Sequence, residues 1–542
     1  MKRRADVVGW VVVALLAWMV AYPILIVGRE AARESAIIAF ARRPAEWQVL
    51  WASIWISLAS VALAAAIGIP LAFLFTRVEF PGSRLLGALI ALPAVLPPLV
   101  GVIAFLFLYG ESGFVARGVQ ALLRLDHSPW HLQGAGAILL VHAYSMYVYF
   151  YLLTRAGLAR IDGSMIEAAQ ALGASRWRTL RRVTLPLLRP ALAGAALLTF
   201  MTALGSFSAP YVFGGGFRVM PTQIVASKLN GDLPRAMVET VALALVALVA
   251  LSLLQRTEGQ ATLVALGKGT APAPRVLVGG RGLVTTAAWA LAVVLLLPHF
   301  TLLLISLVPY ATWTTETLPP VLNLDNYRRL FAESDRLEPL VNSLWMALVA
   351  TAASLVIALA AAWLTVRRRV RPRRIIESLM VLPWALPGTV FALALATAFS
   401  VQRPLGLRWV LVGTSAILPL AYLVRSLPLA GRAVLAGYRQ LDPALEEAAA
   451  ILGAGRWRTL WRVTVPLLRP SLAAGASLAF VTALGDFVTS IVLYTYNTRP
   501  ISIEILSSLR LNELGIAAAF GVLLMTVSAV ALLLGSRTEA WS

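Results

Sequence analysis

Long apolar runs alternate with short polar, arginine-rich segments along the whole chain. Residues 7–27, 51–75 and 284–307 contain no Asp, Glu, Lys or Arg. At about 1.5 Å per residue, a helix of about 20 residues crosses the roughly 30 Å hydrocarbon core of a bilayer. A soluble helix of this length would carry a polar face along one side. The pattern therefore predicts membrane-spanning helices.

We predict twelve spans, centred near residues 18, 61, 97, 145, 202, 246, 296, 353, 387, 420, 482 and 526. Prolines in the spans near 97 and 387 should kink those helices. The first apolar run is read as a retained span, because no small-residue cleavage site follows it before Arg29. The expected fold is an all-α polytopic membrane protein of about twelve transmembrane helices, with both termini on one side.

Charge follows this topology. Only 13% of the 542 residues are charged, about half the usual fraction of a soluble domain. The net charge of +21 could suggest a nucleic-acid partner, but 30 of the 46 Lys and Arg residues lie in the termini and connections of one side. This bias marks that side as cytoplasmic. We therefore expect a multi-pass membrane protein with both termini cytoplasmic, surrounded by membrane lipid and without a nucleic-acid partner.

The chain repeats itself. Residues 167–190 and 447–470 are identical at 19 of 24 positions, at a constant offset of 280. Both copies fall on the predicted cytoplasmic side, so the repeat is parallel, about an axis along the membrane normal. The predicted halves are residues 1–256 and 282–542, each with about six transmembrane helices. A cytoplasmic linker rich in Gly, Ala, Thr and Pro is predicted at 257–281.

Each repeated segment is predicted to form a helix, a break and a second helix. In the first copy Asp162 can cap a helix through Leu172, and Gly173 supplies a permissive C-cap. Ser175 can cap a second helix that Pro186 ends or re-angles. The second copy offers the same features at Asp442, Gly453, Gly455 and Pro466.

These segments resemble the EAA loop of binding-protein-dependent ABC importer permeases. The resemblance rests, in loops 160–190 and 440–470, on Glu167, Ala168, Ala169, Gly173 and Pro186, and on Glu447, Ala448, Ala449, Gly453 and Pro466. In that family the loop is a helix pair that docks in a groove of a cytoplasmic ATPase and couples it to the spans. The double occurrence extends the resemblance over nearly the full chain.

The resemblance implies a place in the bacterial inner (plasma) membrane and a set of partners. Two copies of a cytoplasmic ATP-binding subunit should bind the two loops, and an extracytoplasmic substrate-binding protein should deliver the cargo. The chain has no GxxxxGK[ST] motif, so ATP is expected to be used by the partner subunit, with no cofactor bound here and no catalytic residue. The absence of Cys excludes disulfides and cysteine-ligated metal sites.

The cargo is less defined than the machinery. Fused double permeases of this length resemble the ferric-iron type, and the segment from Gly485 and Asp486 to Asn497 is most similar to that group. The first half departs from it, with Ser206 where the second has Asp486. Thiamine, aminoethylphosphonate and polyamine importers are the alternatives.

Buried polar residues and repeated prolines are the candidates for the translocation pathway. A carboxylate in a span is costly and usually faces a cavity or a partner, so Asp486 is either a cation-attracting pathway group or a structural contact. His142 is read mainly as a packing residue. Arg425 is expected to snorkel to the cytoplasmic surface and Glu239 to lie at the membrane interface. The candidates for the pathway are Asp486, Ser206 and His142, with gate-lining prolines Pro93, Pro97, Pro383 and Pro387.

Two other classes of protein share some of these features. A twelve-span secondary transporter would have the same span count and parallel repeat, but it normally carries buried ion-coupling charges and would leave the duplicated loop unexplained. A membrane enzyme would need paired carboxylates, a nucleophile–base set or a metal cluster, and none is evident in the sequence.

Overall fold

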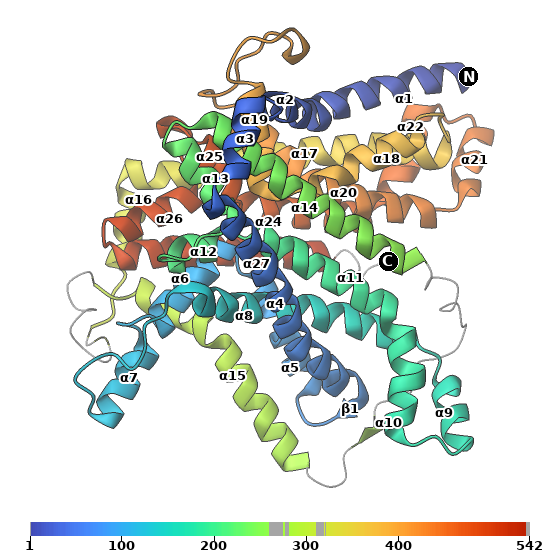
Figure 1. The fold of residues 1–542 in the computed structure, drawn as a ribbon. Helices are drawn as coiled ribbons and strands as arrows, with labels where there is room; N and C mark the ends of the chain where they lie inside the picture. Colours follow the sequence, from blue (N-terminus) through green and yellow to red (C-terminus); the bar gives the residue numbers. More distant parts are fainter. Residues whose placement is uncertain (1, 260–274, 277–280, 310–318, 320, 538–542) are drawn as a thin grey trace.

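The computed structural model describes residues 2–259, 275–276, 281–309, 319 and 321–537 (Figure 1). Ten helices in these residues are long and apolar enough to cross a membrane, or up to twelve if each of two sharply bent helix pairs is one span. The predicted all-α polytopic class is therefore confirmed. The short strands β1 (Val78–Glu79) and β2 (Arg275–Val276) pair in parallel and tie the described part of the inter-half segment to the first half.

The elements of the first half are listed here in chain order, with η for short 3₁₀ or π turns: α1 (Lys2–Leu16), η1 (Ala17–Ala21), α2 (Tyr22–Ala31), α3 (Glu34–Arg42), α4 (Pro44–Arg77), α5 (Ser83–Leu89), η2 (Leu92–Val95), α6 (Pro98–Tyr109), α7 (Phe114–Leu123), α8 (Gly134–Leu158), α9 (Gly163–Ala171), α10 (Arg176–Thr179), η3 (Leu180–Thr184), α11 (Leu185–Leu204), α12 (Ser208–Phe213), α13 (Met220–Leu229) and α14 (Leu233–Gly259).

The second half follows the same order: α15 (Arg281–Ser306), α16 (Asp325–Ala332), α17 (Ser334–Ala362), η4 (Trp363–Arg367), α18 (Arg373–Val381), η5 (Leu382–Trp384), α19 (Gly388–Ala398), η6 (Pro404–Gly406), α20 (Ile417–Gln440), α21 (Pro443–Ile451), α22 (Arg456–Thr459), η7 (Leu460–Thr464), α23 (Val465–Leu467), α24 (Arg469–Leu484), α25 (Val488–Leu493), η8 (Tyr496–Thr498), α26 (Ile501–Arg510) and α27 (Leu514–Arg537). The predicted linker at 257–281 lies largely outside the described residues.

The longest span of the first half shows how the sequence sets a helix. Pro44 occupies the first turn of α4, Glu46 lies in that turn and Arg77 in the last, which suits the missing N–H of proline and the helix dipole. At 34 residues the helix is about 50 Å long, so its ends extend beyond the hydrocarbon. Polar side chains inside it find partners: the Ser53 hydroxyl accepts from the backbone N–H of Met220 at 2.7 Å.

The same internal bond is present in the second half. There Ser343 of α17 accepts from the backbone N–H of Ile501 at 2.7 Å. In each half, the helix before the repeated loop packs on the long second span and on the helix after the loop: α8 on α4 and α11, and α20 on α17 and α24. The two halves are thus built on one plan, as the sequence repeat predicts.

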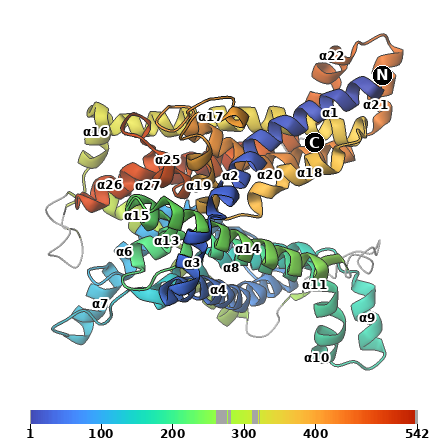
Figure 2. The same cartoon turned by 45° about the horizontal axis from the view of Figure 1, so that its top comes forward.

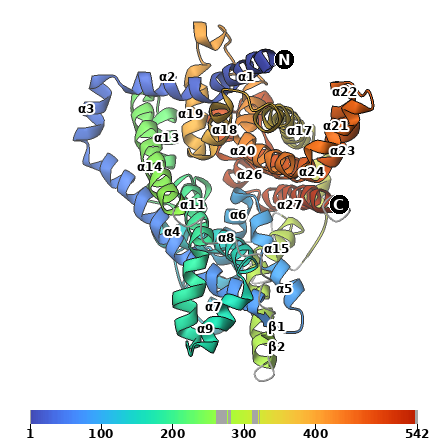
Figure 3. The same ribbon diagram turned by 90° about the vertical axis from the view of Figure 1, so that its right-hand side faces the viewer.

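The first helix of each half packs against the other half. Helix α2 lies on α19, and α15 lies on α6 (Figure 3). Tyr22 of α2 meets Phe399, just beyond α19, with ring centroids 5.9 Å apart. One buried apolar cluster therefore includes residues of α2, α6, α15, α19 and α20. The halves form a single body through this exchange.

The repeated prolines do more than kink their spans. Pro93 and Pro383 lie in the 3₁₀ turns η2 and η5, while Pro97 and Pro387 come directly before α6 and α19. In the second half the segments on either side of this break meet at 108°. The kinks predicted near residues 97 and 387 are therefore breaks between separate helical segments. Two prolines four residues apart remove successive backbone donors, so the helix ends there.

The two loops lie at the same end of the bundle. Figures 1 and 2 place α9, α10, α21, α22 and the N-terminus at one end, and α7, α16 and α26 at the other. We call the first of these the loop end. The spans run between the two ends, so both repeated segments project from one face of the protein.

Candidate functional site

The first loop, residues 160–190, is shaped by its caps. The Asp162 carboxylate accepts from the N–H of Ser164 at 2.9 Å and begins α9. The helix is ended by Gly173, whose φ of +82° lies in the left-handed region. An added Cβ there would meet no other atom, so conformation, not space, favours glycine. Ser175 then caps α10 by accepting from the N–H of Arg178 at 3.3 Å.

The second loop, residues 440–470, repeats this geometry. Asp442 accepts from the N–H of Ala444 at 2.9 Å, and Gly453 has a φ of +80°. Gly455 takes the capping position of α22 without a side-chain bond. The predicted helix–break–helix shape is confirmed in both copies. Glu167, Ala168, Glu447 and Ala448 are exposed, and Ala169 and Ala449 are half-buried.

The loop prolines differ from the prediction. Pro186 does not end the second helix; it lies in the first turn of α11, which follows α10 through the π turn η3. A π turn widens the helix and so makes room for a proline ring that would strike the carbonyl four residues earlier. Pro466 follows the same kind of turn, η7. Only in the second half is there a bend, at Leu468, where the segments meet at 72°.

Both loops expose large apolar side chains at matching positions. Leu172 and Leu452 are 88% and 87% exposed, and Trp177 and Trp457 are also exposed. Large apolar side chains exposed at the tip of a polar loop are typical of a site that contacts a protein partner or a membrane surface.

Sequence reasoning missed the contacts that fix the second loop. Arg367 in η4 forms an ion pair with Glu446 at 2.9 Å and donates to the Leu441 carbonyl at 2.8 Å. Thr464 donates to the other oxygen of Glu446 at 2.8 Å. The residue aligned with Glu446 in the first loop is Ile166, which packs on an apolar cluster instead. Comparing the two copies at this position would have revealed the difference.

The broken spans meet the other half in the protein interior. Pro97 of the first half lies against Gly485 of the second, and Pro387 of the second lies against Gly205 of the first. Both glycines end the helix that follows a loop. Pro93 and Pro383 are buried in the turns beside these contacts. The prolines and the loop-bearing helices therefore converge on one interface between the halves.

Aromatic rings close the same interface. Phe207 and Phe487, each two residues beyond one of these glycines, are buried with ring centroids 5.6 Å apart. Nearer the opposite end, Lys228 donates to the Val492 carbonyl and Arg510 donates to the Tyr211 hydroxyl, each across the two halves. In this conformation the two halves are in contact at the Phe207–Phe487 pair and also nearer the end opposite the loops.

Asp486 lies beside this closure as a partnered carboxylate. It forms an ion pair with Arg425, 2.7 Å from Nε to Oδ2, and accepts from the N–H of Thr489 at 2.7 Å. The Arg425 guanidinium also covers Gly388 at the start of α19. Arg425 is predicted to snorkel to the cytoplasmic surface, and this prediction is wrong. The side chain turns instead to Asp486, because a buried carboxylate needs a charged partner.

The first half replaces this charge pair with neutral groups. Ser206, aligned with Asp486, is 2.9 Å from Nε2 of His142, whose Nδ1 is 2.8 Å from the Ser60 hydroxyl. Ser145 is aligned with Arg425. The carboxylate and the arginine are thus replaced together, so neither is left without the other at this position.

Glu239, which is predicted at the membrane interface, is fully buried within the protein. Its carboxylate accepts from Ser227 at 2.9 Å and pairs with Arg235 at 3.0 Å, which also pairs with Glu46 at 2.5 Å. An ion-paired glutamate can be buried where a free one cannot. Among the described residues, no group of three or more His, Cys, Asp or Glu side chains could hold a metal ion.

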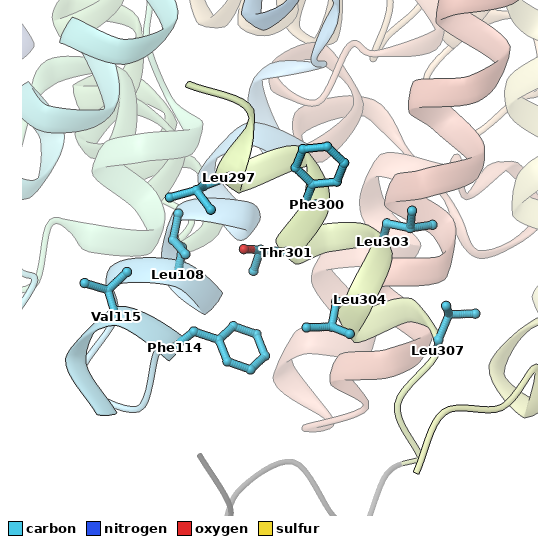
Figure 4. Close-up of a pocket in the computed structure, with 9 residues that line it drawn as sticks. All are labelled: Leu108, Phe114, Val115, Leu297, Phe300, Thr301, Leu303, Leu304 and Leu307. Carbon is cyan, nitrogen blue, oxygen red and sulfur yellow. The ribbon is translucent and has the colours of Figure 1, made fainter. Parts of the chain in front are cut away.

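A separate groove of about 530 Å³ opens between α6, α7 and the exchanged helix α15 (Figure 4). Its lining is apolar apart from Thr301: Leu108, Phe114, Val115, Leu297, Phe300, Leu303, Leu304 and Leu307. The groove is not lined by any residue of the two loops, of the glycine–proline contacts or of the Phe207–Phe487 pair.

Comparison with known proteins agrees with this plan. The family model "Binding-protein-dependent transport system inner membrane component" matches residues 64–256 and again 354–538, one match for each loop. The probable ABC transporter permease protein y4fN of Sinorhizobium fredii is 31% identical over 90% of this chain and 87% of that protein.

Two relatives carry named cargoes. The ferric transport system permease protein FbpB of Actinobacillus pleuropneumoniae is 29% identical over 80% of this chain and 63% of that protein. The thiamine transport system permease protein ThiP of Escherichia coli is 28% identical over 81% of this chain and 79% of that protein.

Proposed function

The chain belongs to the family of binding-protein-dependent transport system inner membrane components, and from this premise we propose that one copy forms the complete permease of an ATP-driven importer. Two copies of a separate cytoplasmic subunit bind and hydrolyse ATP, one on each loop, and this chain binds no cofactor. A substrate-binding protein meets the opposite end. Family membership replaces the alternative of a twelve-span secondary transporter.

One observation carries the proposal. Two loops with the same caps, the same left-handed glycine and the same exposed Leu and Trp project from one end of a single chain. A dimeric ATPase offers two related grooves, so a permease must offer two related docking elements. This chain supplies both without a second copy.

The loop end is assigned to the cytoplasm by its charge. Lys and Arg are concentrated in the connections on the side of the two loops, and cytoplasmic connections carry that excess. This orientation puts both termini inside the cell, and it presents α7, α16 and α26 to the substrate-binding protein.

The geometry supplies a path for coupling. When ATP closes the partner subunits, they carry α9 and α21 with them. The π turns connect the short helices α10 and α22 to α11 and α23–α24, so the motion passes into the spans. Helices α11 and α24 end at Gly205 and Gly485, which contact the broken spans of the other half. A movement of the loops therefore acts on the closure between Phe207 and Phe487.

For the cargo we propose ferric iron. The support is the similarity to a ferric transport permease over 80% of the chain. Thiamine is the second candidate, because a thiamine permease is similar over almost the same span. Asp486 is held in an ion pair with Arg425, which suits a permease that passes its cargo on and leaves selection to the substrate-binding protein.

Coupling is tested at the loop glycines. The double variant Gly173→Asp/Gly453→Asp strains both left-handed positions and adds charge to the docking surface. We expect uptake to be lost while the chain remains in the membrane. Gly413→Asp is the matched control, because Gly413 has a φ of +88° and open space but lies outside both loops. Normal uptake by the double variant would disprove the coupling role.

The cargo is tested in cells that lack their own iron and thiamine importers. The chain is expressed with the ATP-binding subunit and the substrate-binding protein of its own organism, and uptake of radioactive ferric iron and of radioactive thiamine is compared. ATP-dependent uptake of iron alone supports the proposal. Uptake of thiamine alone would replace ferric iron by the second candidate and leave the importer role intact.

A further inference from the structure

The two loops present different surfaces. We infer that the second loop is the main attachment point for the ATPase, and that the first loop binds its ATPase subunit more weakly. This inference rests on the proposed function, because it assumes that both loops dock on ATPase subunits. It adds that the two loops bind two identical ATPase grooves with different affinities.

The difference lies at two aligned positions. Most exposed apolar residues of the loops match closely between the copies: Leu172 with Leu452 and Trp177 with Trp457. Two other aligned positions differ. The residue before the leucine is Ala171 in the first loop and Ile451 in the second, and the residue four positions after the tryptophan is Arg181 or Trp461. Ile451 is 85% exposed and Trp461 is 53% exposed. The second loop therefore offers more apolar area to a partner.

The added tryptophan is arranged for contact. Trp457 and Trp461 are one helical turn apart, with ring centroids 5.7 Å apart and planes at 74°. Edge-to-face rings hold each other in one orientation, so little side-chain freedom remains to be lost on binding. In the first loop Trp177 has Arg181 as its neighbour in this place. Tryptophan is among the residues that contribute most to protein interfaces.

Charged and polar groups attach the second loop to its own half at a position where the first loop has an apolar residue. The contacts of Glu446 with Arg367 and Thr464 connect the start of α21 to the end of the span α17. Arg367 also stacks on the Tyr438 ring, 5.5 Å from its centroid. The corresponding Ile166 makes only apolar contacts with its cluster. A loop held in place by charge and hydrogen bonds is better pre-organised for docking.

The partner chemistry follows from these surfaces. The ATPase groove should be apolar and wide enough for a pair of indole rings next to a leucine. The groove of the subunit that binds the first loop receives Arg181 where the other groove receives Trp461. That groove therefore buries less apolar surface. Exposed Trp and Arg could also lie among lipid headgroups. We favour a protein partner, because α21 and α22 project outward at the loop end (Figures 1 and 2).

The test exchanges the two surfaces. The chain contains no Cys, so a single cysteine can be placed at the exposed aligned positions Gln170 or Ala450 and labelled with an environment-sensitive fluorophore. The labelled full-length chain in nanodiscs is titrated, without nucleotide, with the ATP-binding subunit of its own organism. The Ala450 probe should reach half-saturation at a concentration about tenfold lower than the Gln170 probe.

Reciprocal substitutions supply the matched controls. Trp461→Arg should weaken binding at the Ala450 probe about tenfold, and Arg181→Trp should tighten binding at the Gln170 probe several-fold. The double exchange Arg181→Trp/Trp461→Arg should move the tighter site to the first loop. Equal half-saturation at both probes, or exchanges without effect, would overturn the inference while the importer role stands.

Two further outcomes also decide against it. If brominated lipid quenches Trp461 fluorescence and the ATPase leaves it unchanged, the tryptophan pair serves the membrane surface. If neither probe responds to the ATPase in the parent chain, and uptake does not depend on ATP, the proposed function itself has failed.

Discussion

Gly485 of the second half lies against Pro97 of the first, so closely that a Cβ on the glycine would be 3.1 Å from the proline Cβ. The reciprocal contact of Gly205 with Pro387 is looser, at 3.5 Å. The same contact thus forms twice across the pseudo-two-fold axis, with less room on one side.

This difference in space predicts unequal effects of alanine. Gly485→Ala forces the rigid proline or α24 to shift, and we expect a loss of about 1–3 kcal/mol in unfolding free energy. Gly205→Ala should cost less than about 1 kcal/mol, because 3.5 Å is an ordinary contact. Thermal unfolding of both variants in the same detergent measures the difference. Equal losses would mean that the glycine–proline contact does not limit packing here.

Because Arg425 and Asp486 form an ion pair, we expect substitution of the arginine alone to destabilise the protein more than substitution of both residues. Arg425→Ser leaves a buried carboxylate without its partner, and should destabilise the protein by about 3 kcal/mol. The double variant Arg425→Ser/Asp486→Ser copies the Ser145 and Ser206 of the first half, and should recover to within about 1 kcal/mol of the parent. A double variant as unstable as the single one would show that the arginine acts through another contact.

Glu446 is expected to transmit motion. Glu446→Gln removes the charge that holds the second loop to Arg367 but leaves the exposed docking surface in place. We therefore expect ATPase binding to weaken far less than in Trp461→Arg, because only pre-organisation is lost, while uptake per ATP hydrolysed falls several-fold. Ile166→Leu in the first loop is the matched control and should leave this ratio unchanged. The ratio is measured in proteoliposomes; a parallel loss of ATPase binding would assign Glu446 to docking instead.

The opposite end contains a pH-sensitive contact. Arg336 donates to both oxygens of Glu513, at 2.8 and 2.9 Å. These hydrogen bonds lower the pKa of Glu513 from its ordinary value of 4.5. A depressed carboxyl pKa gives stability that is fully present above 4.5 and is lost as the pH falls through the lowered value.

Glu513→Gln should therefore be less stable than the parent near neutral pH and should lose less stability on acidification below 4.5. Thermal unfolding followed from pH 7 to about pH 3 tests this. Glu338→Gln, at an exposed glutamate of the same end, should follow the parent curve. A Glu513→Gln curve parallel to the parent curve would contradict the assignment.

Much of the fold could be predicted from the sequence because the membrane and the repeat impose simple rules. Apolar runs gave the spans, and the caps at Asp162 and Asp442 with the glycines at 173 and 453 gave the shape of the loops. These features depend on neighbouring residues alone, so a single sequence contains them. The family followed from the same residues.

The sequence did not reveal contacts between distant segments. Arg425 and Asp486 are 61 residues apart, and their pairing depends on how α20 and α24 pack. Arg235 pairs both with the buried Glu239 and with the distant Glu46 of α4. The prolines near 97 and 387 predict a disturbance of the helix, but only its packing against the other half decides between a kink and a break.

The exchange of α2 and α15 between the halves has a consequence for assembly. Each half needs a helix from the other to cover its broken span, so neither half has a complete lipid-facing surface alone. Encoding both halves in one chain raises the effective concentration of each missing helix and prevents pairing with the wrong subunit. If the chain were cut between the halves, the two fragments would have to find each other within the membrane before either could finish folding.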